Sequence, residues 1–254
     1  TWIAVNINFF PICYVHNLML WATQLHAGLQ QFFIFLAGVK LHWLWTALAV
    51  AGVIIVVIFW SGRCKFKGAV AGSIFVSGGI EMVLQVVFLL SFQIMAGFVY
   101  RQLALIIAFF MTGLAIGAGW ISRKNFSPSN TIAARARFIR VQALICVLPL
   151  GLVLMLPLIQ GGMRNYFSLA AMGWLFSGLS LITGIVGGVH FALAVNVAAG
   201  SGAAQEKIGG GFYALDLAGA AAGVLLATLF IIPIYGIVNT LIFLSAMSGI
   251  SLLT

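Results

Sequence analysis

Long apolar runs alternate with short polar connectors along most of this chain. A helix crosses the hydrocarbon layer of a bilayer with about 20 mostly apolar residues, and seven stretches have that character. They are Leu41–Trp60, Gly68–Gly97, Leu103–Trp120, Arg140–Ile159, Phe167–Ala199, Gly211–Pro233 and Tyr235–Thr254. The pattern predicts an all-α protein, a polytopic membrane helix bundle of about seven spans over residues 41–254, with a tight turn at Ile232–Gly236.

Residues 1–40 have a different pattern. Between Pro11 and Leu36, apolar side chains recur at helical spacing but are interrupted by amides and imidazoles such as Gln24 and His26. The segment has too many amides for a span, so we expect an exit segment followed by an amphipathic helix lying in the membrane interface. If this helix did cross, the chain would have eight spans and its N-terminus would change sides.

The composition supports a membrane protein. Of the 254 residues, 63% are apolar and only 6% are charged, whereas a soluble domain carries about 25% charge. So few ions cannot cover a surface that faces water, which excludes a soluble globular domain, a disordered chain and a nucleic-acid-binding module. The net charge of +9 does not indicate a nucleic-acid partner, because the cations lie in the connectors between apolar runs.

The cations also predict an orientation. Three of them, Lys40, Arg101 and Arg164, fall on one side of the predicted bundle. The other nine fall on the opposite side: Arg63, Lys65, Lys67, Arg123, Lys124, Arg135, Arg137, Arg140 and Lys207. The positive-inside rule then places the C-terminus in the cytoplasm and residues 1–40 outside. The membrane that we expect is a bacterial inner (plasma) membrane.

The two ends of the sequence suggest a larger protein. No Lys or Arg precedes Lys40, so the basic start of a signal peptide is missing. The sequence opens at Thr1 and closes within an apolar run, and we expect it to be part of a longer polypeptide.

Ionisable residues inside the predicted spans are candidates for function, because each costs about 2.5–3.5 kcal/mol or more at mid-helix. Glu81, with Gln85 one turn further on, lies in the second run, His190 in the fifth and Asp216 in the sixth. A carboxyl in a low-dielectric environment is protonated or paired, and it binds a proton or an amine strongly. The four residues are candidates for a substrate or proton site. Alternatively, they form hydrogen bonds that lock the helices together, which the sequence favours for Gln85 and His190.

Small residues predict where helices pack closely. Gly113 and Gly117, and likewise Gly219 and Gly223, are separated by three residues, a spacing that allows two helix backbones to approach in lipid. No strand precedes the glycine run at residues 209–211, so this run is not a phosphate-binding or S-adenosylmethionine-binding loop. The three cysteines form no CxxC pair, and no metal site is predicted.

Several stretches resemble the membrane part of the integral-membrane spermidine synthase-like (polyamine aminopropyltransferase-like) family. The first resembles the segment that leaves the aminopropyltransferase domain, and the others resemble the membrane repeat. They are Asn6–Trp21 (NINFFPICYVHNLMLW), Gly79–Gln85 (GIEMVLQ), Phe110–Gly117 (FMTGLAIG), Gly188–Leu193 (GVHFAL), Tyr213–Gly223 (YALDLAGAAAG) and Phe230–Gly236 (FIIPIYG).

The resemblance implies that the last six spans form a unit like half of a major facilitator. It also implies that full family members carry a Rossmann-type, methyltransferase-like domain. The glycine-rich loop and catalytic aspartates of that domain have no counterpart here, so aminopropyl transfer is not expected of these residues. The matched motifs include Glu81, Gln85, His190 and Asp216, and the resemblance assigns these residues no chemistry.

Three functions are compatible with the sequence. The first is a non-catalytic membrane domain that passes a small cationic substrate or anchors protein subunits or a soluble domain, with no cofactor. The second is a membrane subunit of an electron-transfer complex, with a b-type haem between His42 and His190 or a quinone near Trp43 and Trp45. The third is a purely structural subunit in the lipid bilayer.

Overall fold

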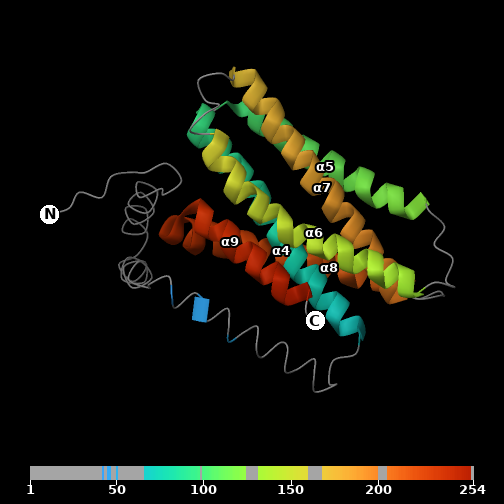
Figure 1. The fold of residues 1–254 in the computed structure, drawn as a ribbon. Helices are drawn as coiled ribbons and strands as arrows, with labels where there is room; N and C mark the ends of the chain where they lie inside the picture. The colour runs from blue at the N-terminus through green and yellow to red at the C-terminus, as the bar shows by residue number, and fades with distance from the viewer. Residues whose placement is uncertain are drawn as a thin grey trace, which may run out of the picture.

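The structure is a computed structural model that describes residues 42, 45–46, 50, 66–97, 99–123, 131–159, 168–199 and 205–252 (Figure 1). The predicted exit segment and interfacial helix at residues 1–40, and most of the first predicted span, lie outside the described residues.

Nearly all of the described residues are helical, as the apolar pattern predicts, and none of them lies in a strand. Six α-helices and one π-helical segment follow one another. They are α4 (Phe66–Ala96), α5 (Tyr100–Arg123), α6 (Thr131–Leu158), α7 (Leu169–Ala199), α8 (Gln205–Leu226), the π-helical η2 (Ala227–Ile231) and α9 (Ile232–Leu252).

Five helical stretches of the described chain are long and apolar enough to cross a membrane. The first four correspond to α4, α5, α6 and α7, and the fifth is Ile208–Leu252, which contains α8, η2 and α9. A straight helix of that length would measure about 68 Å, more than twice the thickness of a hydrocarbon layer of about 30 Å. The backbone is interrupted within α9 at Gly236, where φ is 79° and ψ is 172°.

The helices on either side of η2 run in opposite directions. Successive α4 residues Phe75 and Gly79 face successive α8 residues Gly219 and Gly223, so α8 runs parallel to α4. By contrast, α9 runs antiparallel to α6, because Gln142 pairs with Ser248 whereas Cys146, further along α6, pairs with the earlier Ser245.

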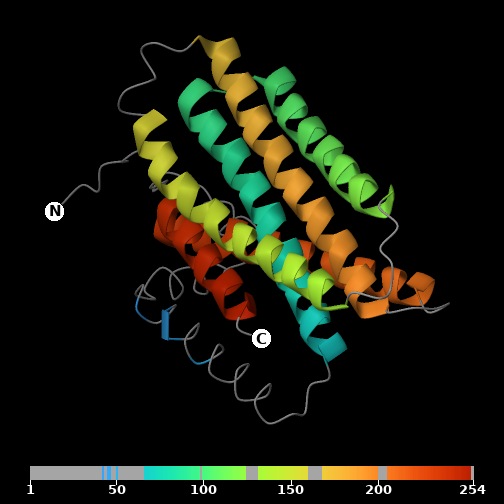
Figure 2. The ribbon, with the colours of Figure 1, turned by 45° about the vertical axis from the view of Figure 1, so that its right-hand side comes forward.

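Contacts among α4, α5, α6 and α7 give the directions of the remaining helices relative to α4. Gln85 contacts Ser180, whereas Glu81 lies against Gly187, so α7 is antiparallel to α4. Phe138, near the beginning of α6, stacks on His190, near the end of α7, and Figure 2 shows the end of α6 and the beginning of α7 at the same end of the bundle, so α6 is antiparallel to α7. Helix α5 runs parallel to α7, because Gly113 and Gly117 face the successive residues Ile185 and Val189. Successive described helices from α4 to α9 therefore alternate in direction.

The most extensive contacts join helices that are not neighbours in the sequence. α5 pairs with α7, α4 with α8 and α6 with α9, and α4 contacts all five of the other described α-helices. Figure 2 shows α4, in teal, between α6 and α7. The core between these helices is aromatic, with Phe176 edge-on to Phe88 at 6.4 Å and to Phe92 at 5.9 Å between ring centroids.

The outward faces of the bundle are apolar. Large hydrophobic side chains of α5, α6 and α8 are exposed, including Ile107, Met111, Ile116, Leu144, Val147, Leu154, Leu217 and Leu225. A surface of this kind is suited to lipid and not to water.

Two helices begin earlier than the apolar pattern suggested. The fourth and sixth predicted spans begin at Arg140 and Gly211, whereas α6 begins at Thr131 and α8 begins at Gln205 and includes the glycine run. Arginine side chains can extend along a helix end with the guanidinium at the membrane surface, so helix α6 continues through residues too polar for the hydrocarbon layer. The long fifth run is the unbroken helix α7.

Candidate functional site

The backbones of α4 and α8 approach each other at glycines. A β-carbon placed on Gly79 would lie 3.0 Å from the carbonyl oxygen of Gly219, and one on Gly223 would lie 2.7 Å from the Cα of Gly79. A β-carbon on Gly219 would overlap the carbonyl of Phe75. Helices can cross this closely only where no side chain separates them, so the predicted Gly219 and Gly223 pair lies at the α4–α8 crossing.

Asp216 lies one turn before Gly219, on the side of α8 that faces α4. Its carboxyl lies directly over Gly78, where a β-carbon would overlap the Oδ1 atom. The side chain of Asp216 is half-buried. Because Gly78 has no side chain, the Asp216 carboxyl can occupy the space beside it.

Glu81 has the same kind of environment on another side of α4. Its carboxyl lies against Gly187 of α7, where a β-carbon would overlap Oε2 and lie 2.7 Å from Oε1. The Glu81 side chain is half-buried. Because Gly78 and Glu81 are one turn apart on α4, the carboxyls of Glu81 and Asp216 lie at one level of the bundle, where α4 meets α7 and α8. They are close enough for their charges to interact.

No cation among the described residues pairs with either carboxyl, and no described donor forms a hydrogen bond to them. Arg101 is exposed in the first turn of α5 and Arg140 in the third turn of α6, and Arg140 donates from Nε to the carbonyl of Ala136 at 3.3 Å. Two carboxyls this close in a low-dielectric environment cannot both carry a charge without a compensating proton or cation.

Gln85 follows Glu81 by one turn and is buried against α7. The hydroxyl of Ser180 lies 2.7 Å from the Oε1 atom of Gln85 and 2.8 Å from the carbonyl oxygen of Ile106. A hydroxyl has one proton to donate, so the two acceptors share it. The Gln85 Nε2 atom is buried and has no hydrogen-bond partner among the described residues.

His190 follows Gly187 by one turn of α7, toward the beginning of α6. The side chain is only 1% exposed, and its ring stacks on Phe138 with 4.8 Å between centroids and 24° between planes. Its Nε2 atom is buried without a hydrogen-bond partner in the described part of the chain.

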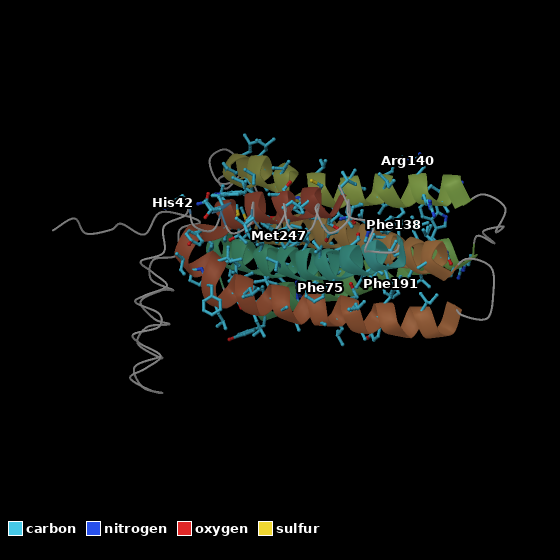
Figure 3. All side chains as sticks on the ribbon, turned by 90° about the horizontal axis from the view of Figure 1, so that it is seen from below. His42, Phe75, Phe138, Arg140, Phe191 and Met247 are labelled. Atoms are coloured by element: carbon cyan, nitrogen blue, oxygen red, sulfur yellow. The ribbon has the colours of Figure 1, made fainter. Side chains whose placement is uncertain are left out.

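The two histidines proposed for a haem are not brought together. Figure 3 shows His42 at one end of the molecule and Phe138, on which His190 stacks, toward the other end. The described residues also contain no group of three or more His, Cys, Asp or Glu side chains that could hold a metal ion. Trp45 packs edge-on to Phe243 with ring centroids 6.4 Å apart, whereas Trp43 lies outside the described residues.

The other predicted glycine pair lies at the α5–α7 interface. A β-carbon on Gly113 would lie 2.9 Å from the backbone nitrogen of Ile185, and one on Gly117 would lie 2.9 Å from that of Val189. Gly184 and Gly188 of α7 meet α5 in the same way. Gly184 and Gly188 are four positions apart, as are Gly113 and Gly117. This spacing is the feature of the sequence from which the two α7 glycines could have been predicted to pack against a helix.

No protein-family model, curated protein or solved structure matches this chain. The chemistry assigned to the site therefore rests on its own residues.

Proposed function

We propose that this chain is an integral membrane transport domain that binds a small cation, a proton or a protonated amine, between Glu81 and Asp216. The observation that carries this proposal is the placement of two carboxyls at one level of an apolar bundle, each accommodated by a glycine of the facing helix and neither paired with a described cation.

The physical reason is the cost of charge in lipid. One ionised carboxyl away from water attracts a cation far more strongly than it would in water, and a second carboxyl nearby strengthens this attraction. Ionisable residues in membrane spans mark substrate and proton pathways for this reason. A purely packing role would be served by amides or small residues without that cost.

The helix directions support a transporter-like unit. Helices α4, α5 and α6 run up, down and up, and α7, α8 and α9 run down, up and down. Two triplets of opposite orientation are a feature of the six-helix half of a major facilitator. The resemblance to the membrane part of spermidine synthase-like proteins agrees with this architecture and supports an anchoring role for a soluble domain or partner subunits beside transport.

The cation distribution supports an orientation in the bacterial inner membrane. Lys67 and Lys207 lie near the beginnings of α4 and α8, and Arg123 ends α5; with alternating directions, these helix ends share one side of the bundle. Arg101 lies at the beginning of α5, on the other side. By the positive-inside rule, the first side, where α9 ends, faces the cytoplasm.

The test is uptake into proteoliposomes that contain the purified protein. Proton entry would be followed with an entrapped pH-sensitive dye, and amine entry with radiolabelled spermidine. Glu81→Gln and Asp216→Asn keep the side-chain shape and remove the charge, so we expect either one to lower uptake at least about tenfold.

The matched control is Glu206→Gln, which removes the only other carboxyl side chain of the sequence, in the first turn of α8. This variant should transport at the wild-type rate. Unchanged uptake in both site variants would overturn the cation site and leave only the anchoring role.

A further inference from the structure

Polar side chains form a continuous stripe where α4 packs on α7. On α4 the members are one turn apart, and on α7 Thr183 follows Ser180 by three positions and His190 follows Thr183 by seven, with Gly187 between them facing Glu81. We call this stripe the polar seam; it consists of Ser77, Glu81 and Gln85 on α4, and Ser180, Thr183 and His190 on α7. Apart from half-buried Glu81, each of these side chains is at most 5% exposed.

Besides the contacts of Ser180 with Gln85 and Ile106, two hydroxyls of the seam donate hydrogen bonds to backbone carbonyls. Ser77 donates to the carbonyl of Ile74 at 3.1 Å, and Thr183 donates to the carbonyl of Ser180 at 2.9 Å. These bonds satisfy the hydroxyl protons and leave the hydroxyl oxygens able to accept.

Two nitrogens of the seam have no such bond, and they lie on opposite sides of Glu81. The Gln85 Nε2 atom is one turn from Glu81 in one direction, and His190 is one turn beyond Gly187, which the Glu81 carboxyl contacts, in the other direction. Neither nitrogen has a hydrogen-bond partner among the described residues. A buried polar nitrogen is costly unless it is hydrogen-bonded, and buried water commonly supplies the missing bond.

We propose that the polar seam is a proton path in which water molecules connect Gln85, Glu81 and His190. This inference rests on the proposed function and narrows its cation to a proton. The amide NH₂ of Gln85 orients the water next to it, Glu81 accepts and releases the proton, and His190 carries it toward the cytoplasmic side. Asp216, close enough to interact with Glu81, supplies the second negative charge that holds the proton at this level.

Each step moves a proton and no electrons. One O–H or N–H bond breaks at the donor and one forms at the next oxygen or nitrogen. His190 accepts a proton at one of its ring nitrogens and releases one to the next water, so the imidazole returns to its starting state. One proton enters at one side of the membrane for each proton that leaves at the other side.

The stacking on Phe138 fixes the plane of the His190 imidazole. A variant that keeps this stacking can therefore separate the role of the ring nitrogens from the role of packing. His190→Phe retains an aromatic ring of similar size on Phe138 but removes both nitrogens. His190→Gln retains an N–H donor and an acceptor without the stacking. Gln85→Leu removes the amide at nearly constant volume. The control is Gln102→Leu, which removes a buried glutamine of α5 that lies against Gly173, away from the seam.

The experiment measures proton entry into proteoliposomes driven by an imposed membrane potential, together with spermidine uptake and thermal unfolding of each variant. We expect His190→Phe to slow proton entry about 100-fold, because a positioned side chain accelerates proton transfer by about that factor. His190→Gln should recover part of the rate, and Gln85→Leu should slow it. Gln102→Leu should leave proton entry at the wild-type rate.

A second readout does not depend on transport. The infrared carbonyl band of a protonated carboxyl should shift in His190→Phe and Gln85→Leu, because both variants remove a group that orders water beside Glu81. A merely structural histidine would change the unfolding temperature and leave this band in place.

The outcomes separate this inference from the proposed function. If Glu81→Gln and Asp216→Asn abolish uptake while both seam variants conduct protons normally, the seam proposal is wrong and the cation site stands. A second result would lead to the same conclusion. If the protein takes up spermidine through both acids but moves no protons, the seam proposal is wrong and the cation site stands. If the acid variants have no effect, the proposed function itself fails.

Discussion

At the scale of single residues, two glycines determine where the two acids lie. Gly78 and Gly187 do not serve as turns; each lies within a helix, and the space beside it is occupied by a carboxyl from another helix. Glu81 and Asp216 approach each other because the helices around them have no side chain at these two positions.

Gly187→Ala tests this arrangement. The added methyl would overlap the Glu81 carboxyl, which is the end of a flexible side chain and can move aside. We therefore expect a stability change within about 1 kcal/mol but a clear loss of cation uptake, measured in the proteoliposome assay. Gly178→Ala, on the same helix with no atom within 4 Å of the added β-carbon, is the control. Normal uptake in Gly187→Ala would show that the carboxyl position does not matter.

The sequence could identify the acids but not their proximity. Glu81 and Asp216 stand out because a charge in an apolar run is costly, and that argument needs no structure. Their closeness depends on how α4 and α8 cross, which no local pattern specifies. Gly78 is one of 29 glycines, and its position opposite Asp216 exists only in the folded bundle.

At the scale of helices, the α5–α7 interface consists of backbone against backbone. A β-carbon on Gly188 would overlap the carbonyl of Leu114 and lie 2.8 Å from the nitrogen of Ala118. Neither atom can move without shifting a helix, which distinguishes this position from Gly187.

We expect Gly188→Ala to destabilise the protein by about 1–3 kcal/mol, the usual cost of overpacking. Thermal unfolding in detergent micelles would measure the effect. Gly119→Ala on α5 is the matched control, because a β-carbon there has no atom within 4 Å. An equal unfolding temperature for the two variants would contradict the close approach of α5 and α7.

The reversal between α8 and α9 gives a second prediction at this scale. Gly236 has φ 79° and ψ 172°, a conformation available almost only to glycine. Gly236→Ala should cost about 1–3 kcal/mol of unfolding free energy. In Gly249→Ala, the nearest atom to the added β-carbon is the Cys146 sulfur at 3.7 Å, an ordinary contact, so its unfolding temperature should stay near the wild-type value. A wild-type unfolding temperature for Gly236→Ala would show that this conformation is not required.

The apolar pattern predicted the helices better than their ends. An apolar run marks the length of helix that lipid covers, whereas α6 and α8 continue into polar residues that the headgroup region accepts. The turn near Ile232–Gly236 could be expected because proline and glycine lie close together there, but the chain stays helical through most of that pentapeptide and reverses at Gly236.

At the scale of the whole molecule, the alternating directions and the cations give a topology that can be measured. Tyr100 and Arg123 are the exposed ends of α5. In a variant without the native cysteines, Arg123→Cys should react with a membrane-impermeant maleimide only from the cytoplasmic side, and Tyr100→Cys only from the opposite side. Right-side-out and inside-out vesicles provide the two accessible faces, and the reverse labelling pattern would overturn the orientation.

The interleaved pairing of helices has a consequence for how the protein is made. Among the described helices, α4, α5 and α6 find their most extensive contacts with α8, α7 and α9 and have few with one another. During synthesis, α4, α5 and α6 are made before these partners. We therefore expect Glu81 to lack its neighbours on α7 and α8 until the C-terminal half of the chain has been made.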